Sequence, residues 1–144
     1  MTSIRLAEIH GFIVHFPIAL LLSATAADLA WMAGLTGDAR LGAILMAGGL
    51  AMGLVAMAAG MVDFTRLDQA LVPHALRHML AVGLAWLGYA VALYLRRDAL
   101  TGSSVLPMAS VATSCVSAVV LALGGFLGGR LVYTFGAGVS AVRR

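Results

Sequence analysis

The chain has 144 residues, of which 62% are hydrophobic and 10% are charged, and its mean hydropathy is +1.02. A soluble domain is nearer half apolar and a quarter charged, so this composition excludes an ordinary soluble enzyme and indicates a protein built for lipid. All nine basic residues are arginines, and the formal net charge is +3. Most of them flank apolar runs, where they can reach lipid headgroups, so we expect no nucleic-acid partner.

Four apolar runs follow one another, at about residues 12–34, 41–62, 74–95 and 108–127. Each is close to the ~20 apolar residues that a helix needs to cross a bilayer. The connections between them are short, which favours antiparallel neighbours. The sequence therefore predicts an all-α, integral membrane four-helix bundle with up-down-up-down topology, formed by one domain over residues 1–144.

A proline and an aspartate lie inside the first run. Pro17 has no N–H to offer the carbonyl group of Ile13, so we expect a kink there. Asp28 lies near the far end of the run, where we expect it to serve as an anchor at the membrane interface. Cys115, the only cysteine, lies within the fourth run and is interpreted as a small packing residue.

The second and fourth runs are rich in glycine. Gly49 and Gly53 are four residues apart in the second run, as are Gly124 and Gly128 at the end of the fourth. Small residues at this spacing let another helix approach closely, so these spans could also pair two copies of the chain.

All four histidines lie at the starts of the first and third spans. Because these two helices run in the same direction, their starts share one membrane face with the ends of the second and fourth spans. The two halves of the chain also resemble a weak parallel repeat, an arrangement that often frames a site. The residues expected to gather on this face are His10, His15, His74, His78, Asp63, Arg66, Arg77 and Arg130.

Neutral imidazole is a good axial ligand for haem iron, so this arrangement suggests a b-type haem between the first and third spans. His15 and His78 are the best candidate ligands, because each lies about one to two turns past its helix start. His10 is five residues before His15, about 140° around an unkinked helix, so both could not point at one iron. His10 and His74 are then neighbouring groups or ligands of a second site.

Three arginines are candidates for binding the propionate groups of such a haem at the membrane face, namely Arg66, Arg77 and Arg130. The predicted function is a small redox subunit that passes electrons to a membrane or redox protein partner. No catalytic residue is predicted, and an electron-transfer or accessory role is favoured over a stand-alone enzyme.

Other interpretations remain open. A histidine at a span end can simply contact water or a headgroup. His15 and His78 could instead bind a transition metal together with Asp63 or Met61, since imidazole and thioether ligands suit copper, zinc or iron. The chain could also bind no cofactor and act as a non-catalytic anchor or assembly subunit of a larger membrane complex, because glycine-rich faces suffice for helix packing.

Several motifs resemble a bacterial membrane family called domain of unknown function 2231. They cover most of the chain, and the His-Phe-Pro and Gly-Gly-x-Leu-Val-Tyr segments are the more specific parts. The resemblance implies four spans in a bacterial inner membrane and no particular activity. Some relatives carry a Rieske-type iron–sulfur domain, which implies electron transfer by analogy. The motifs are His10-x4-His15-Phe16-Pro17-Ile18-Ala19-Leu20, Gly60-x2-Asp63, His74-x3-His78 and Gly128-Gly129-x-Leu131-Val132-Tyr133.

The distribution of arginines predicts the orientation, because cytoplasmic loops carry an excess of basic residues. The histidine side has six: Arg5, Arg66, Arg77, Arg130, Arg143 and Arg144. The other side has three: Arg40, Arg96 and Arg97. This favours both termini in the cytoplasm, although the counts become equal if three of the six serve a cofactor.

Overall fold

The structure is a computed structural model that describes residues 6–36, 38–102 and 105–137. The described residues form α-helices and short 3-10 helices and no strand. The elements in chain order are α1 (Leu6–Ile13), α2 (His15–Met32), α3 (Arg40–Phe64), η1 (Gln69–Leu71), α4 (Val72–Leu95), η2 (Arg97–Thr101) and α5 (Met108–Tyr133). Arg5, Arg143 and Arg144, which entered the charge comparison, lie outside the described residues.

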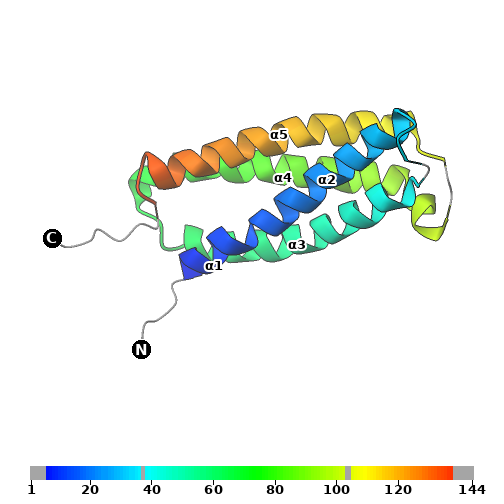
Figure 1. The fold of residues 1–144 in the computed structure, drawn as a ribbon. Helices are drawn as coiled ribbons and strands as arrows, with labels where there is room; N and C mark the ends of the chain where they lie inside the picture. The colour runs from blue at the N-terminus through cyan, green and yellow to red at the C-terminus, as the bar shows by residue number, and fades with distance from the viewer. Residues whose placement is uncertain (1–5, 37, 103–104, 138–144) are drawn as a thin grey trace.

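The helices form an up-down-up-down bundle in which α1 and α2 together make the first long rod (Figure 1). The predicted all-α four-helix fold is therefore confirmed. The main packing lies between α2 and α3 and between α4 and α5, so the bundle consists of two helical hairpins. The last helix continues to Tyr133, beyond the expected end at Leu127.

The first rod is kinked where Pro17 predicts it. α1 ends at Ile13, Val14 adopts a turn, and α2 begins at His15. The chain stays continuous through hydrogen bonds from Val14 N to the carbonyl oxygen of His10 (3.1 Å) and from Ile18 N to that of Val14 (3.4 Å). The kink turns α1 onto the end of α3.

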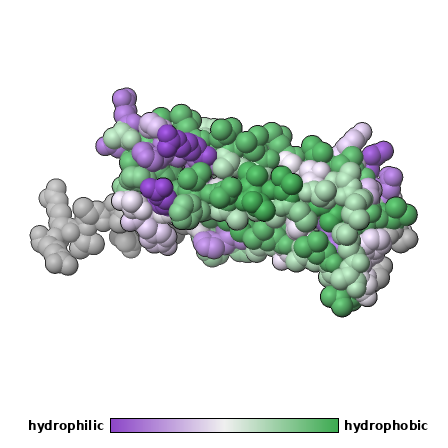
Figure 2. Space-filling view, turned by 90° about the horizontal axis from the view of Figure 1, so that it is seen from above, coloured by the Kyte–Doolittle hydropathy of each residue, from purple (hydrophilic) through white to green (hydrophobic). Residues whose placement is uncertain are grey.

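The outer surface of the bundle is apolar. Four helical segments, His10–Met32, Arg40–Phe64, Gln69–Leu95 and Met108–Tyr133, are long and apolar enough to cross a membrane. Large hydrophobic side chains such as Leu80, Val119 and Phe126 are exposed around them. Hydrophobic residues cover the middle of the molecule and hydrophilic residues gather mainly at its two ends (Figure 2). The chain is therefore a multi-pass membrane protein whose exposed apolar belt faces lipid.

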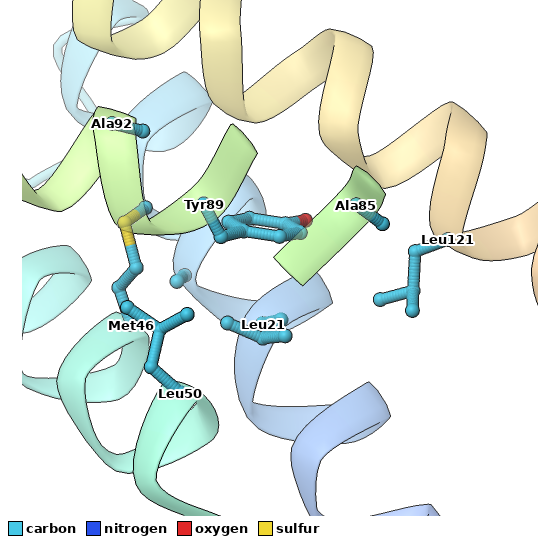
Figure 3. Close-up of a cluster of buried hydrophobic side chains, with 8 residues drawn as sticks. Leu21, Met46, Leu50, Ala85, Tyr89, Ala92 and Leu121 are labelled. Atoms are coloured by element: carbon cyan, nitrogen blue, oxygen red, sulfur yellow. The ribbon is translucent and has the colours of Figure 1, made fainter. Parts of the chain in front are cut away.

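The centre of the bundle is filled by one cluster of aliphatic side chains around Tyr89 (Figure 3). Tyr89 is fully buried, and its hydroxyl group forms a 2.9 Å hydrogen bond with Thr25 Oγ1. Trp86 lies beside the cluster and donates a 3.0 Å hydrogen bond to the carbonyl oxygen of Leu50. The side chains of the cluster come from α2, α3, α4 and α5: Leu21, Ala24, Met46, Leu50, Ala85, Tyr89, Ala92 and Leu121.

All four rods also meet at a buried ion pair near the end opposite the histidines. Asp28 on α2 and Arg96 at the end of α4 are each only 1% exposed, and the guanidinium group of Arg96 donates to both carboxylate oxygens of Asp28. Arg96 Nε also donates to Ser110 Oγ on α5 (2.7 Å), which in turn donates to the carbonyl oxygen of Ala92 (2.7 Å). A Cβ on Gly42 of α3 would overlap the Asp28 carboxylate and lie 3.1 Å from Arg96 Nη1. The expectation that Asp28 anchors the membrane interface is therefore wrong.

The ion pair lies at the centre of an internal duplication. Asp28 and Arg96 are 68 residues apart, and the same offset relates Gly42 to Ser110. It also relates the buried residues of α3 to those of α5, helix turn by helix turn. The matching buried positions are Gly42, Ala43, Met46, Gly49, Gly53 and Ala56 in α3, and Ser110, Val111, Ser114, Ser117, Leu121 and Gly124 in α5.

The contacts between helices repeat in the same way. Contacts between α2 and α5 correspond to those between α4 and α3, which is the relation that a two-fold axis along the bundle produces. The weak parallel repeat suggested by the sequence is thus a duplication of the packing, with the two charges of the ion pair at equivalent positions.

We predict that Asp28→Asn or Arg96→Gln lowers the free energy of unfolding by about 3–5 kcal/mol, because either change leaves one buried charge without its partner. The measurement is reversible unfolding in mixed micelles, followed by circular dichroism.

Exchanging the equivalent residues tests whether the two halves are duplicates. The fourfold variant Asp28→Arg, Arg96→Asp, Gly42→Ser, Ser110→Gly rebuilds the same contacts with the halves reversed, so we expect it to be more stable than either single variant. The twofold exchange of charges alone should stay unstable, because Gly42 offers no hydroxyl group to the new arginine. A fourfold variant that is no more stable than the twofold variant would contradict the duplication.

Candidate functional site

His78 is held in a defined orientation between α4 and α5. Its Nδ1 donates a 2.8 Å hydrogen bond to the carbonyl oxygen of Gly124, one helical turn before Gly128. A Cβ on Gly128 would lie only 2.8 Å from Cε1 of the imidazole, so glycine is what allows the ring to lie against α5. With the proton on Nδ1, Nε2 carries the lone pair. This is the orientation that metal-ligating histidines commonly have.

His10 occupies the equivalent place in the first half, 68 residues earlier. Its ring lies against Gly60 of α3, where a Cβ would be 2.9 Å from Cε1. Its Nδ1 is buried and has no hydrogen-bond partner among the described residues. Both histidines therefore place the ring on a glycine of the neighbouring helix, and within the described structure the His78 ring also forms a hydrogen bond to the carbonyl group one turn earlier.

His10 and His78 form what we call the histidine pair. The charges of His78 and of Asp63 at the end of α3 both act electrostatically on His10. The pair lies at the end of the bundle where α1 and α4 begin and α3 and α5 end (Figure 1). The expected gathering of histidines at one end of the bundle is thus what the structure shows, but its inner members are His10 and His78.

His15 does not take the place beside His78 that helix depth suggested. It is exposed on the outer surface of the first rod, where it lines an open apolar groove with Phe12, Phe16, Ala19 and Leu20. The reason is geometric. His10 and His15 are five residues apart, about 140° around a helix, so His10 lies against Gly60 of α3 while His15 faces outward.

His74, Arg77 and Arg130 lie together in a separate place. With Leu127 and Phe135 they line a pocket of about 110 Å³ between the start of α4 and the end of α5, which we call the basic pocket. Arg66 is exposed in the turn after α3 and does not line this pocket. Two of the three arginines expected to share a role are therefore brought together.

The structure bears on the transition-metal interpretation as well. Over residues 6–36, 38–102 and 105–137, no group of three or more histidine, cysteine, aspartate or glutamate side chains is arranged to hold a metal ion. The histidine pair supplies two imidazoles, and Met61, the suggested thioether ligand, is exposed on the outside of α3.

Comparison with family models matches residues 7–141 to the family described as "Predicted membrane protein (DUF2231)". The chain belongs to this family. The match includes the histidine pair, both glycines beneath it and the ion pair, and it confirms the resemblance drawn from the motifs. Comparison with curated proteins and with solved structures finds no match.

We predict that Gly128→Ala destabilises the protein by about 1–3 kcal/mol, as overpacking of a filled interface does, and displaces the His78 ring. The displaced ring should lose its hydrogen bond to Gly124, which ¹⁵N chemical shifts of selectively labelled histidine would detect. Gly125→Ala is the matched control, because a Cβ at Gly125 meets nothing within 4 Å. Equal effects of the two substitutions would contradict the assigned role of Gly128.

Proposed function

We propose that this protein is a small redox subunit of a bacterial cytoplasmic membrane that binds a b-type haem through His10 and His78. The observation that supports the proposal most is the hydrogen bond from His78 Nδ1 to the carbonyl oxygen of Gly124, because it leaves Nε2 as the ligating nitrogen. The equivalent placement of His10 over Gly60 offers a second imidazole from the other half.

The residues present suit haem better than a bare metal ion. An electron-transfer haem would be held by two side chains of the protein, whereas protein sites for zinc or copper usually use three or four. Within the described residues, no group of three or more histidine, cysteine, aspartate or glutamate side chains is arranged to hold a metal ion. A haem would supply reversible one-electron transfer within the apolar bundle. The chain would supply the two imidazoles, the backbone carbonyl that orients one of them, and two glycines that admit the rings.

Asp63 adds a charge that bears on this proposal. It lies at the end of α3, within electrostatic range of His10. A carboxylate near an axial imidazole favours the more positive, oxidised form of an iron site, because opposite charges stabilise each other at short range in a medium of low dielectric constant. Asp63 would therefore lower the reduction potential of the bound haem.

The predicted orientation gains support from the ion pair. The orientation was predicted from the number of arginines on each side of the membrane, but Arg96 is buried in an ion pair with Asp28 and is not available to the headgroups. Without Arg96 in the count, the side opposite the histidines has Arg40 and Arg97. We therefore infer that both termini and the histidine pair lie toward the cytoplasm.

The electron partner is inferred to bind away from the glycine-rich faces. Gly49 and Gly53 contact Leu21 and Trp86, and Gly60 contacts His10, so the small residues of α3 are used within the chain. These contacts within the chain leave the small residues of α3 unavailable for pairing two copies.

Visible absorption of the detergent-purified protein, oxidised and then reduced with dithionite, tests the proposal. We expect sharp α and Soret bands in the reduced protein, and we expect His10→Ala and His78→Ala each to abolish them. His15→Ala is the matched control and should keep the bands, because His15 faces outward.

Two results would overturn the assignment. A featureless spectrum from protein produced with ample haem would remove the haem proposal. Loss of the bands in His15→Ala but not in His10→Ala would retain haem and refute the histidine pair as its ligands.

A further inference from the structure

The basic pocket belongs to the second half of the chain alone. Its five lining residues are His74, Arg77, Leu127, Arg130 and Phe135. The positions 68 residues earlier hold Leu6, Ile9, Ala59, Val62 and Leu67, which are all apolar. Because the first half has the same helix packing without these polar groups, packing alone does not account for them. The pocket is therefore specific to the second half of the chain. In this it differs from the histidine pair, to which each half contributes one residue.

In the described part of the chain, the two arginines of the pocket form no ion pair with a carboxylate. The ion pairs of the described residues are Arg96 with Asp28 and Arg97 with Asp98, so neither Arg77 nor Arg130 is neutralised by a carboxylate there. Nδ1 of the half-buried His74 is shielded from solvent and has no hydrogen-bond partner in the described structure. An unneutralised arginine pair beside an unsatisfied imidazole nitrogen is suited to an anion.

The ring of Phe135 contacts both His74 and Arg130. Its ring lies 4.3 Å from that of His74 between centroids, and the guanidinium carbon of Arg130 lies 5.8 Å from its centroid. The turn after α5 puts the ring there. Phe135 N donates to the carbonyl oxygen of Arg130 (3.2 Å), and Gly136 adopts φ +68°, which glycine tolerates.

We propose that the basic pocket binds the phosphate group of an anionic phospholipid such as phosphatidylglycerol. The planar guanidinium group matches phosphate oxygens in a two-pronged contact, and a pocket of about 110 Å³ has room for one phosphate group. The pocket lies at the end of membrane-spanning helices, where headgroups reside. A choline headgroup would bring its own positive charge toward the two arginines, so the site discriminates against phosphatidylcholine.

The test measures lipid binding to the delipidated protein in mild detergent by native mass spectrometry, with phosphatidylglycerol and phosphatidylcholine as competing probes. For the unaltered chain we expect a preference for phosphatidylglycerol on the order of tenfold. The double variant Arg77→Gln, Arg130→Gln should lose this preference. Arg66→Gln is the matched control, because it removes an exposed arginine of the same membrane face from outside the pocket.

A second arm replaces lipid by inorganic phosphate and follows the thermal unfolding midpoint, which also reports whether each variant folds. Stabilisation by inorganic phosphate without any lipid preference would identify free phosphate as the ligand and overturn the lipid assignment. Equal lipid preference in all three proteins would overturn it too. If the double variant keeps its lipid preference but shifts the haem absorption bands, the two arginines serve the haem propionates instead.

Discussion

The buried pair of Asp28 and Arg96 is the constraint on which the rest of the bundle depends. Moving two charges into an apolar interior costs several kcal/mol for each ion, and that cost is offset only when geometry and hydrogen bonding are nearly complete. Here the carboxylate accepts from both arms of the guanidinium group, Ser110 accepts from the remaining Nε, and Gly42 leaves the space. Each of the four rods contributes one residue to the ion pair or its surroundings, so the ion pair specifies how the four rods pack.

The packing that the ion pair specifies continues to the opposite end of the bundle, because the two halves of the chain are duplicates. Once the pair fixes the register of the two hairpins, the same axis relates each helix position of one half to its equivalent in the other. His10 and His78 are equivalent in this sense, as are Gly60 and Gly128 beneath them. Two imidazoles offered from equivalent places suit a ligand that is bound from two opposite sides, and a haem iron is such a ligand. The basic pocket departs from the duplication and so has a different role.

Much of the fold could be predicted because its signals are local. Four apolar runs gave the spans, Pro17 gave the kink, and the glycine spacing of the second span gave its close contacts with Leu21 and Trp86. Asp28 and Arg96 were misjudged for the opposite reason. Each lies near a span end, where hydropathy alone places a charge at the interface, and only their partnership across the bundle explains their burial.

The candidate site was predicted at the level of its location but not its geometry. Helix direction places all four histidines at one end, as the structure shows. Depth along the helix favoured His15, whereas in the structure His10 lies against Gly60 and His15 is exposed. One signal in the sequence also favours His10: at an offset of 68, His78 aligns with His10 and Gly128 with Gly60, while His15 aligns with Gly83.

The two-fold relation between the hairpins can be measured directly by double electron–electron resonance in a chain whose Cys115 is replaced by serine. Spin labels at Ser23 and Val119 report one distance, and labels at Val91 and Ala51 report its equivalent; all four positions are exposed. The account predicts superimposable distance distributions for the two pairs. Clearly different distributions would contradict the duplication, and with it the equivalence of His10 and His78.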